Sequence, residues 1–310
     1  MVEAGFHFGT IAIVGIGLIG SSVASALRAG GFEGTIKIAD QDAASLATAE
    51  ELGLGDNYFA DASSACAGAD VVVLCVPVGA MAAIGETIGP SLKDGAIVTD
   101  VGSVKGSVIE ALTSSLPASV RIVAGHPIAG SEQSGPRAGY ATLFRHRWCI
   151  ITPTPTVDQD AVDTVAAMWR GFGSDVEVMD PARHDLVLAI TSHLPHLIAY
   201  NIVRTASDME EVTEAEVIKF SAGGFRDFTR IAASDPTMWR DVFLNNREAV
   251  LETLGRFSED LAALQRAIRW RDGDSLYELF ERTRTIRMGI IDAGQDTAVP
   301  NFGRPIENGS

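Results

Sequence analysis

A single histidine stands in a loop of small residues that follows an apolar run. The segment GHPIAGSEQSG covers residues 125–135, directly after VRIVA, and places His126 beside Pro127. An imidazole exchanges protons near neutral pH, so it can serve as a general base. If VRIVA is a strand, its end carries His126 to the edge of a sheet, where the small residues leave room for a substrate. We therefore predict a catalytic role for His126.

A second polar loop follows another apolar run. DVGSVKGS covers residues 100–107 and comes directly after AIVT. Ser103 can hydrogen-bond either the imidazole or a substrate hydroxyl, and we expect it near the reaction. We interpret Lys105 as a structural residue that pairs with a nearby carboxylate or phosphate.

The second half of the chain adds histidines and arginines. TSHLPHLIAY places His193 and His196 three positions apart, so both can face one side of a helix, which Pro195 is expected to kink. The segment has no HExxH-like pattern, and we expect no metal site. GGFRDFTR brings Arg226 and Arg230, and an arginine in such a turn can hold a carboxylate through two hydrogen bonds. A surface ion pair remains the alternative for these arginines.

GIGLIG is a glycine-rich turn with the spacing of a dinucleotide site. Gly15 permits a tight turn, Gly17 lets a pyrophosphate approach the backbone, and Gly20 allows the helix and the strand to pack closely. The turn follows one predicted strand and opens a helix, whose N-terminus favours phosphate charge. Asp40 ends the second predicted strand, 20 residues after Gly20. This context predicts dinucleotide binding.

Asp40 also indicates which dinucleotide binds. Its carboxylate can accept hydrogen bonds from an adenosine ribose but would repel a 2′-phosphate, and no arginine follows it in ADQDAAS. NAD is therefore favoured over NADP. Asp40 could instead be the N-cap of the next helix, but Asp42 is a competing candidate for that N-cap. The residues predicted to contact the cofactor are Gly15, Gly17, Leu18, Ile19, Gly20, Asp40, Val76, Pro77 and Ser103.

The elements that position these residues alternate along the first part of the chain. Apolar runs predict strands at 10–15, 35–40, 70–77, 96–103, 120–127, 148–153 and 175–180, and most pairs are separated by amphipathic stretches long enough for crossover helices. Almost wholly apolar strands that alternate with helices are typical of a parallel sheet covered on both faces. We expect a Rossmann-type, doubly wound α/β domain with a mostly parallel sheet, whose strand ends gather the loops described above.

A different pattern begins at Asp180. Pro181 stands just inside a predicted helix start with Asp180 as its N-cap, and apolar residues then recur at helical spacing up to Met288. We divide the chain into a dinucleotide-binding domain (1–179), an all-helical domain (180–290) and a C-terminal tail (291–310).

The overall charge narrows the class of partner. The 310 residues carry a formal net charge of −16, which disfavours nucleic acid and anionic membrane surfaces. The three cysteines show no CxxC spacing and fit a reducing compartment. The first residues, MVEAGFHFG, lack the basic and apolar regions of a signal peptide. We expect a cytoplasmic protein whose partner is a small molecule.

Together these segments resemble the prephenate/arogenate dehydrogenases of tyrosine biosynthesis. GIGLIG, DVGSVKG, GHPIAGSEQSG, SHLPH and GGFRDFTRIAASDPTMWRD occur in that family's order. The resemblance implies NAD-dependent oxidative decarboxylation of a cyclohexadienyl substrate, either prephenate or arogenate. It also implies that the helical domain forms a homodimer. The choice between the two substrates stays open.

The resemblance further implies roles for individual residues. His126 takes the proton of the substrate's ring hydroxyl, and Ser103 lies near that hydroxyl and the nicotinamide. His196 binds the substrate, Arg230 holds one of its carboxylates, and Glu132 pairs with that arginine across the cleft. The other residues predicted to contact or shape the substrate pocket are Ser131, Gly223, Asp227 and Trp239.

Two other functions fit parts of the pattern. A β-hydroxyacid dehydrogenase also joins a Rossmann domain to a helical one, but its catalytic lysine lies on the helix that leads into the second domain, and residues 181–207 contain no lysine. A non-catalytic NAD-binding module would retain the nucleotide site but would not need His126, Ser103 and Arg230 together.

Overall fold

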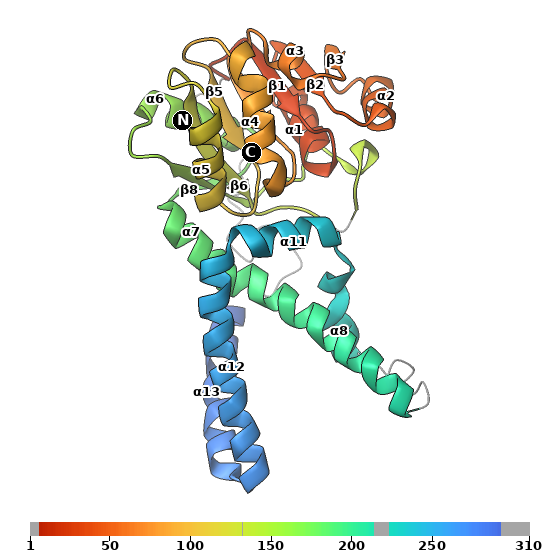
Figure 1. Ribbon diagram of the computed structural model, residues 1–310, viewed down its shortest axis with the longest axis vertical. Coiled ribbons are helices and arrows are strands. Elements are labelled where there is room, and N and C mark those ends of the chain that lie inside the picture. The colour runs from red at the N-terminus through yellow and green to blue at the C-terminus, as the bar shows by residue number, and fades with distance from the viewer. Residues whose placement is uncertain (1–5, 132, 214–222, 293–310) are drawn as a thin grey trace.

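The computed structural model describes residues 6–131, 133–213 and 223–292. Its first part is built on an eight-stranded sheet in the order β3-β2-β1-β4-β5-β6-β7-β8. Figure 1 shows this sheet and its helices above a separate group of helices. The strands are β1 (Thr10–Val14), β2 (Thr35–Ala39), β3 (Asn57–Phe59), β4 (Val71–Leu74), β5 (Ile97–Asp100), β6 (Arg121–Pro127), β7 (Trp148–Pro153) and β8 (Asp175–Val178).

The sheet is mostly parallel, as the sequence predicts. Every neighbouring pair of strands is parallel except β6 and β7, which are antiparallel. Each predicted strand contains an observed one. Only the edge strand β3 was not predicted, because three partly exposed residues carry too little apolar pattern to stand out.

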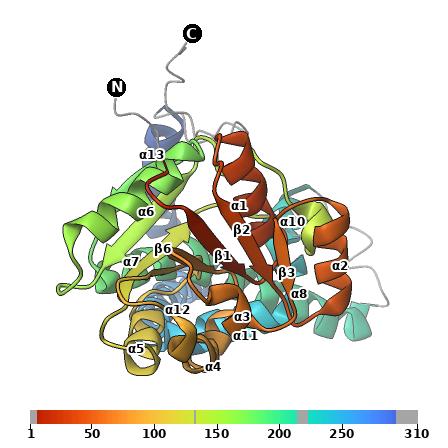
Figure 2. The same ribbon diagram turned by 90° about the horizontal axis from the view of Figure 1, so that it is seen from above.

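Helices cover both faces of the sheet. Along β1, Ile11 and Ile13 face one apolar cluster and Ala12 and Val14 face the other, so the strand is buried on both sides. Figure 2 shows the helices arranged on the two sides of the strands. On the first face lie α1 (Leu18–Ala29), α2 (Ala43–Glu51) and α6 (Gln159–Gly171), and on the second lie α3 (Ala62–Cys66), α4 (Met81–Ile88) and α5 (Gly106–Ser115).

From residue 181 onward, the described chain consists of helices. Asp180 begins this part by accepting hydrogen bonds from the backbone N–H groups of Ala182 and Arg183, which confirms the predicted N-cap. The hairpin of the last two helices projects away from the sheet (Figure 1). The helices are α7 (Pro181–Leu188), α8 (Leu194–Thr213), α10 (Gly223–Thr229), α11 (Pro236–Asn245), α12 (Arg247–Trp270) and α13 (Gly273–Asp292), with a 3-10 turn, η5 (Arg230–Ala233).

A π-helical turn joins α7 to α8. It covers Ala189–His193, immediately before Leu194 and Pro195. A proline ring conflicts with regular α-helical hydrogen bonding, and a wide turn is one of the ways in which a helix accommodates it. The distortion expected at Pro195 is therefore present.

The continuous helix formed by α7, the π turn and α8 has the length and composition of a membrane span. Pro181–Met209 is long and apolar enough to cross a membrane by length and composition, and in the described residues it is the one helix that meets this test. However, it carries three polar residues that are buried inside this protein, namely His184, Asp185 and His193. Only 22% of its apolar window is buried, but length and composition alone are weak evidence for a membrane span, and these buried polar residues make it part of the helical part's packing.

A small apolar cluster connects the two parts of the chain. Trp239 and Val242 on α11 pack with Val104, which lies between β5 and α5. Val78, in the 3-10 turn η1 (Val78–Ala80) after β4, packs against the same cluster. The helical part is thus docked against the loops at the carboxyl ends of the strands.

Candidate active site

The glycine turn after β1 has the backbone that a dinucleotide site requires. Gly15 has a φ of 92°, and a Cβ atom there would lie 2.4 Å from the carbonyl oxygen of Cys75. A Cβ at Gly20 would lie 2.0 Å from the carbonyl oxygen of Gly15. A Cβ at Gly17 would instead meet nothing within 4 Å. Gly15 and Gly20 are therefore needed by the fold, whereas Gly17 leaves open space.

The start of α1 is suited to phosphate. Gly17 is its N-cap and offers no side chain to the first N–H groups of the helix. These groups point along the axis of a 12-residue helix and favour negative charge. The first helical residues are Leu18 and Ile19, while Val76 and Pro77 follow β4, the strand beside β1.

Asp40 directly follows β2, and its side chain is hydrogen-bonded to the glycine turn. Its Oδ2 accepts a hydrogen bond from Ile16 N at 2.8 Å, and its Oδ1 accepts one from Asp42 N at 2.9 Å. Asp42, not Asp40, caps α2 by accepting hydrogen bonds from Ala44 N and Ser45 N. A carboxylate has about four acceptor positions, so Asp40 retains capacity for ribose hydroxyls.

His126 lies near the end of β6 and is 7% exposed. A buried ion pair fixes the strand beside it. Lys105 and Asp100, both fully buried, are paired, and Lys105 Nζ also donates to the carbonyl oxygen of Gly125 at 2.6 Å. Asp100 Oδ1 accepts a hydrogen bond from Gly125 N at 3.2 Å. The backbone immediately before His126 is therefore held on both its N–H and its C=O, and the structural interpretation of Lys105 is confirmed.

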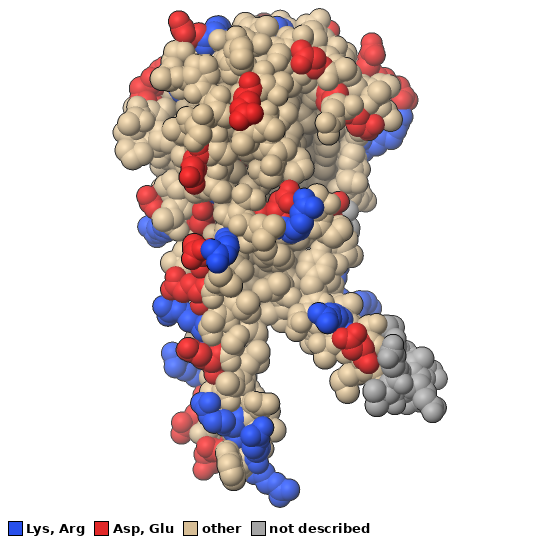
Figure 3. All heavy atoms as spheres, in the orientation of Figure 1, with Lys and Arg blue, Asp and Glu red and all other residues tan. Residues whose placement is uncertain are grey.

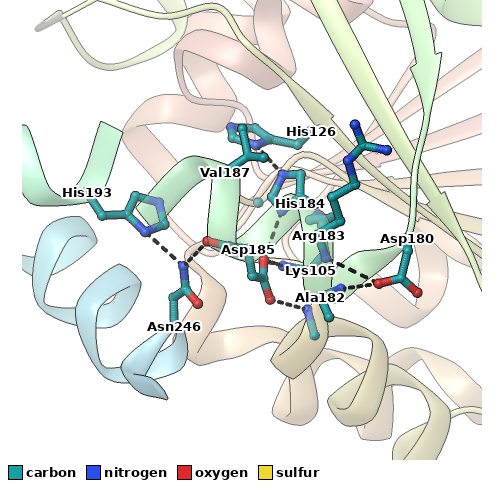
Figure 4. A network of polar contacts seen from close by, with 12 residues as sticks. Lys105, His126, Asp180, Ala182, Arg183, His184, Asp185, Val187, His193 and Asn246 are labelled. Carbon is teal, nitrogen blue, oxygen red and sulfur yellow. Dashed lines mark hydrogen bonds and ion pairs between the residues drawn. The ribbon is translucent and has the colours of Figure 1, made fainter. Parts of the chain in front are cut away.

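Behind His126 lies a second histidine. His126 Nδ1 is 2.9 Å from His184 Nε2, and His184 Nδ1 is 2.8 Å from Asp185 Oδ1. Figure 4 shows the two imidazoles and the carboxylate in sequence, with α7 supplying the last two. His126 Nε2 has no hydrogen-bond partner among the described residues and is not one of their fully enclosed polar atoms. The imidazole is thus anchored at Nδ1 and accessible at Nε2.

Asp185 connects this chain of contacts to the sheet domain. Its two oxygens accept hydrogen bonds from Lys105 N and Gly106 N, each at 2.8 Å, at the start of α5. Burial would raise the pKa of Asp185, but hydrogen bonds from His184 and from those two N–H groups outweigh it and hold the pKa below its usual value. Asp185 is therefore an anion at neutral pH.

The histidines of the site are neutral at that pH. Burial, with smaller contributions from His184, Lys105 and His193, lowers the pKa of His126 well below 6.5. Burial also lowers the pKa of His184, despite the opposing effect of Asp185. His126 is consequently able to accept a proton at neutral pH.

On the helical side, aromatic rings gather around Trp239. His196 stacks on the Trp239 ring with centroids 3.7 Å apart, and its Nδ1 lies 2.8 Å from the carbonyl oxygen of Ser192. His193 meets the same tryptophan edge-on at 6.0 Å, and its Nδ1 lies 3.0 Å from Asn246 Nδ2. His193, the last residue of the π turn, and His196, in the first turn of α8, thus contact the same tryptophan.

Ser103 and Arg230 lie beside this aromatic group. Ser103 is half-buried, and its backbone is close enough to His193 to affect the pKa of that residue. No hydrogen bond joins Ser103 to His126 in the described residues. Arg230, at the start of η5, is exposed, and its positive charge helps burial to lower the pKa of His196.

The other predicted substrate-binding residues have no contact with His126 or Trp239 among the interactions of the described residues. Gly223 is the first residue of α10, and Asp227 on the same helix is exposed and pairs with Arg226 at 3.1 Å. Ser131 is exposed in the loop after β6, where its hydroxyl accepts a hydrogen bond from Gln133 N. Glu132 lies outside the described residues, so its predicted pairing with Arg230 stays a prediction.

Known proteins resemble this chain over nearly its whole length. Family models for the nucleotide-binding domain and the dimerization domain of prephenate dehydrogenase match residues 23–178 and 180–282. The cyclohexadienyl dehydrogenase of Zymomonas mobilis is 42% identical and aligns over 91% of this chain and 96% of its own length. The chain belongs to the prephenate dehydrogenase family.

Solved structures agree with this family assignment. A prephenate dehydrogenase from A. aeolicus, crystallised with hydroxyphenyl propionate and NAD⁺, is 37% identical with a TM-score of 0.85, and the match covers 91% of this chain and 98% of that one. An arogenate dehydrogenase from Synechocystis is 26% identical with a TM-score of 0.77, over 90% and 99% of the two chains. This member of the prephenate dehydrogenase family is therefore an oxidoreductase with a nucleotide-binding domain.

Sequence reasoning missed several polar residues of this family member. His184, Asp185 and Asn246 were not considered, and Asp100 was read only as part of a polar loop. Asp100 carried a signal, because a carboxylate at the end of an apolar strand must find a buried partner. His184 and Asp185 gave only a weak signal in the sequence, because they are polar residues in a predicted helix that is otherwise rich in apolar residues.

Proposed function

We propose that this chain catalyses the NAD-dependent oxidative decarboxylation of prephenate to 4-hydroxyphenylpyruvate, of arogenate to tyrosine, or of both. The observation that carries the proposal is His126, whose Nδ1 is anchored by His184 while Nε2 stays accessible at the end of a strand. That strand belongs to the same sheet as the glycine turn suited to a dinucleotide. The proposal is supported by the family and by relatives named for these two activities.

The proton transfer is assigned to His126. As the ring carbon that bears the hydroxyl loses a hydride, Nε2 accepts the hydroxyl proton, and the carbon becomes a carbonyl. The bond to the ring carboxylate also breaks, carbon dioxide leaves, and the electron pair of that bond enters the ring and places negative charge on the oxygen that lost its proton. The protonated His126 can return its proton to that oxygen, so the product is a neutral phenol and the base is regenerated.

The dinucleotide is assigned to the glycine turn. When bound, NAD supplies the hydride acceptor. The uncapped N–H groups of α1 would hold the pyrophosphate, the open space at Gly17 would admit it, and Asp40 would accept hydrogen bonds from the adenosine ribose. The carboxylate of Asp40 would repel a 2′-phosphate, so we propose NAD as the preferred form over NADP.

The substrate is assigned to the space between the two parts of the chain. Arg230 would pair with a substrate carboxylate, and the stacked pair of His196 and Trp239 would form a wall of the pocket. Ser103, Ser131, Glu132, Gly223 and Asp227 remain proposed contacts of the same pocket. In a protein of net charge −16, the guanidinium of Arg230 would supply the local positive charge that an anionic substrate needs.

The organisation of the chain is part of the proposal. We divide it into a dinucleotide-binding domain (1–179), a helical domain (180–290) and a tail (291–310). The match of residues 180–282 to a dimerization domain supports a homodimer formed by the helical domain. A cytoplasmic location is proposed because the three cysteines, with no CxxC spacing, fit a reducing compartment.

The activity can be measured directly. Purified protein mixed with NAD and prephenate, or with NAD and arogenate, should produce absorbance at the wavelength of NADH, together with 4-hydroxyphenylpyruvate or tyrosine. The ratio of kcat/KM for the two substrates assigns the preference, and a parallel assay with NADP assigns the cofactor. Absence of NADH with both substrates would refute the proposed function.

A further inference from the structure

His184 and Asp185 stand directly behind the proposed base. His126 Nδ1 and His184 Nε2 are 2.9 Å apart, and His184 Nδ1 and Asp185 Oδ1 are 2.8 Å apart (Figure 4). All three residues are buried, with exposed fractions of 7%, 0% and 9%. Two ring nitrogens at this distance share a single hydrogen, so the protonation of one imidazole determines that of the other.

Asp185 sets the direction of this chain of hydrogen bonds. Its carboxylate already accepts hydrogen bonds from the backbone N–H groups of Lys105 and Gly106, and an ionised carboxylate can only accept. The hydrogen between Asp185 and His184 must therefore belong to His184 Nδ1. A neutral His184 then has a lone pair on Nε2.

The surroundings keep His184 neutral. The charged and titratable groups that act on the two imidazoles are Asp100 of β5, Lys105 at the start of α5, Asp185 of α7 and His193 of the π turn. Lys105 and Asp100 form a buried ion pair, so their charges largely cancel. Burial is the largest cause of the lowered pKa of His184, and together with the charge of Lys105 it exceeds the opposing effects of Asp185 and Asp100.

From this geometry we infer that His184 and Asp185 are positioning residues that select the tautomer of His126. Because His184 Nε2 is an acceptor, His126 Nδ1 carries the hydrogen and His126 Nε2 carries the lone pair. The inference rests on the proposed function, in which His126 Nε2 is the base. After Nε2 accepts a proton, the positive charge on His126 is stabilised through His184 by the carboxylate of Asp185.

This arrangement also makes the base depend on both parts of the chain. His126 lies on β6, whereas α7 supplies His184 and Asp185. Asp185 in turn holds the start of α5 through two backbone N–H groups. The correct tautomer is therefore set only when α7 is docked against α5 and β6.

A spectroscopic test needs neither substrate nor cofactor. The chain has 6 histidines, so protein labelled with ¹⁵N-histidine gives a simple long-range ¹H–¹⁵N spectrum in which protonated and unprotonated ring nitrogens are distinguished. The spectrum of His126→Asn assigns the signals of His126. At pH 7.5 we expect a protonated Nδ1 and an unprotonated Nε2 in both His126 and His184. A protonated Nε2 in His126, or a doubly protonated His184, would overturn the inference.

Asp185→Asn tests the direction of the chain. Its amide can donate to His184 Nδ1, which would move the hydrogen of His184 to Nε2 and that of His126 to Nε2. We expect this tautomer change in the spectrum and a fall in kcat of about 100-fold or more, with a much smaller change in KM. The matched control is Asp180→Asn, a carboxylate-to-amide change at the N-cap of the same helix, which should leave kcat unchanged. An Asp185→Asn enzyme with the wild-type tautomer and kcat would contradict the inference.

A pair of changes at His184 separates tautomer selection from packing. In His184→Gln, the side-chain oxygen can accept from His126 Nδ1, so we expect kcat to stay within about 10-fold of the wild-type value. His184→Leu has a similar bulk but no acceptor, and we expect a loss of about 100-fold or more. Equal losses in the two variants would mean that His184 serves packing only. If the wild-type chain oxidises neither substrate, the proposed function fails, while the tautomer spectrum still decides this inference.

Discussion

His126 combines two properties that a general base needs at neutral pH. Burial lowers its pKa well below 6.5, so it is unprotonated, and its Nε2 remains accessible while Nδ1 is held by His184. A base with a lower pKa accepts protons less strongly, but it stays in the reactive form as the solution becomes mildly acidic. We therefore expect that protonation of His126 does not lower kcat/KM as the pH falls from 7.5 to 6.5, and that any loss from this residue begins at a lower pH.

Replacing this imidazole should affect the chemical step. We expect His126→Asn to lower kcat by about 1,000-fold with a change in KM of no more than a few-fold, because the variant loses the base but keeps the pocket. Steady-state kinetics with the preferred substrate measure both constants. His7→Asn, a change at an exposed histidine, is the control and should keep the wild-type kcat. A His126→Asn enzyme with unchanged kcat would remove the proposed base.

Arg230 should have the opposite signature. Arg230→Ala removes a proposed carboxylate partner, so we expect KM to rise by about 10-fold or more while kcat changes less. The control is Arg204→Ala, which breaks an exposed ion pair with Asp208 on α8 and should leave both constants unchanged. A larger effect on kcat than on KM would instead assign Arg230 to the reaction itself.

At the scale of elements, the turn between β1 and α1 separates glycines that the fold needs from one that it does not. A Cβ at Gly15 or Gly20 would clash with a carbonyl oxygen, whereas a Cβ at Gly17 would meet only open space. The local fold therefore tolerates a side chain at Gly17. A ligand that approaches the backbone at Gly17 would collide with such a side chain.

Gly17→Ala tests this distinction. We expect the thermal midpoint to change little, while the Kd for NAD rises by about 10-fold or more, because the methyl group occupies the path of the pyrophosphate. Calorimetric titration with NAD measures the Kd. Gly255→Ala is the matched control on the exposed face of α12, where the new methyl group also meets nothing within 4 Å and NAD binding should not change. Unchanged NAD affinity in Gly17→Ala would place the pyrophosphate elsewhere.

At the scale of the whole molecule, the helical hairpin carries much apolar surface. No residue of Gly273–Asp292 is buried. Three of its large apolar side chains are 57–69% exposed, namely Tyr277, Phe280 and Ile286. Along α12 and α13, acidic and basic side chains are interspersed on the face seen in Figure 3. A helix of 20 residues gains little stability without a packed face, so this hairpin needs a partner surface.

We expect that partner to be a second copy of the chain. Light scattering should give a mass of twice 32.7 kDa, and charged residues in place of Phe280 and Ile286 should lower it towards that of one chain. Leu52→Glu, at an exposed apolar residue beside α2, is the control and should keep the wild-type mass. A wild-type mass of one chain would contradict the dimer.

Acid should destabilise the folded protein in a defined pH range. His126, His184 and His193 have folded-state pKa values below 6.5, and that of His193 is lowered by burial to about 4. Below pH 6.5 the unfolded chain binds more protons than the folded one, so the free energy of unfolding falls as pH decreases from 6.5 to 4. His193 alone accounts for about 3 kcal/mol over that range. Urea unfolding at fixed protein concentration between pH 7.5 and 4.5 measures the change, and a constant value would contradict it.

The sequence by itself determined the sheet, the glycine turn, the start of the helical part and the candidate base. These features depend on local signals: apolar runs, glycine spacing, the Asp180–Pro181 helix start and a histidine at a strand end. Local signals failed for β3, because Asn57–Phe59 is too short to show a pattern.

Only the tertiary structure decided what stands behind His126. His184 is 58 positions away in the chain, and its partner Asp185 holds an α5 that begins 79 positions earlier. Nothing in the spacing of these residues distinguishes them from other polar positions on α7. Their role arises because β6, α5 and α7 are packed together, and burial then forces each donor to find an acceptor. The sequence specifies which groups are present, and the packing specifies which of them share a hydrogen.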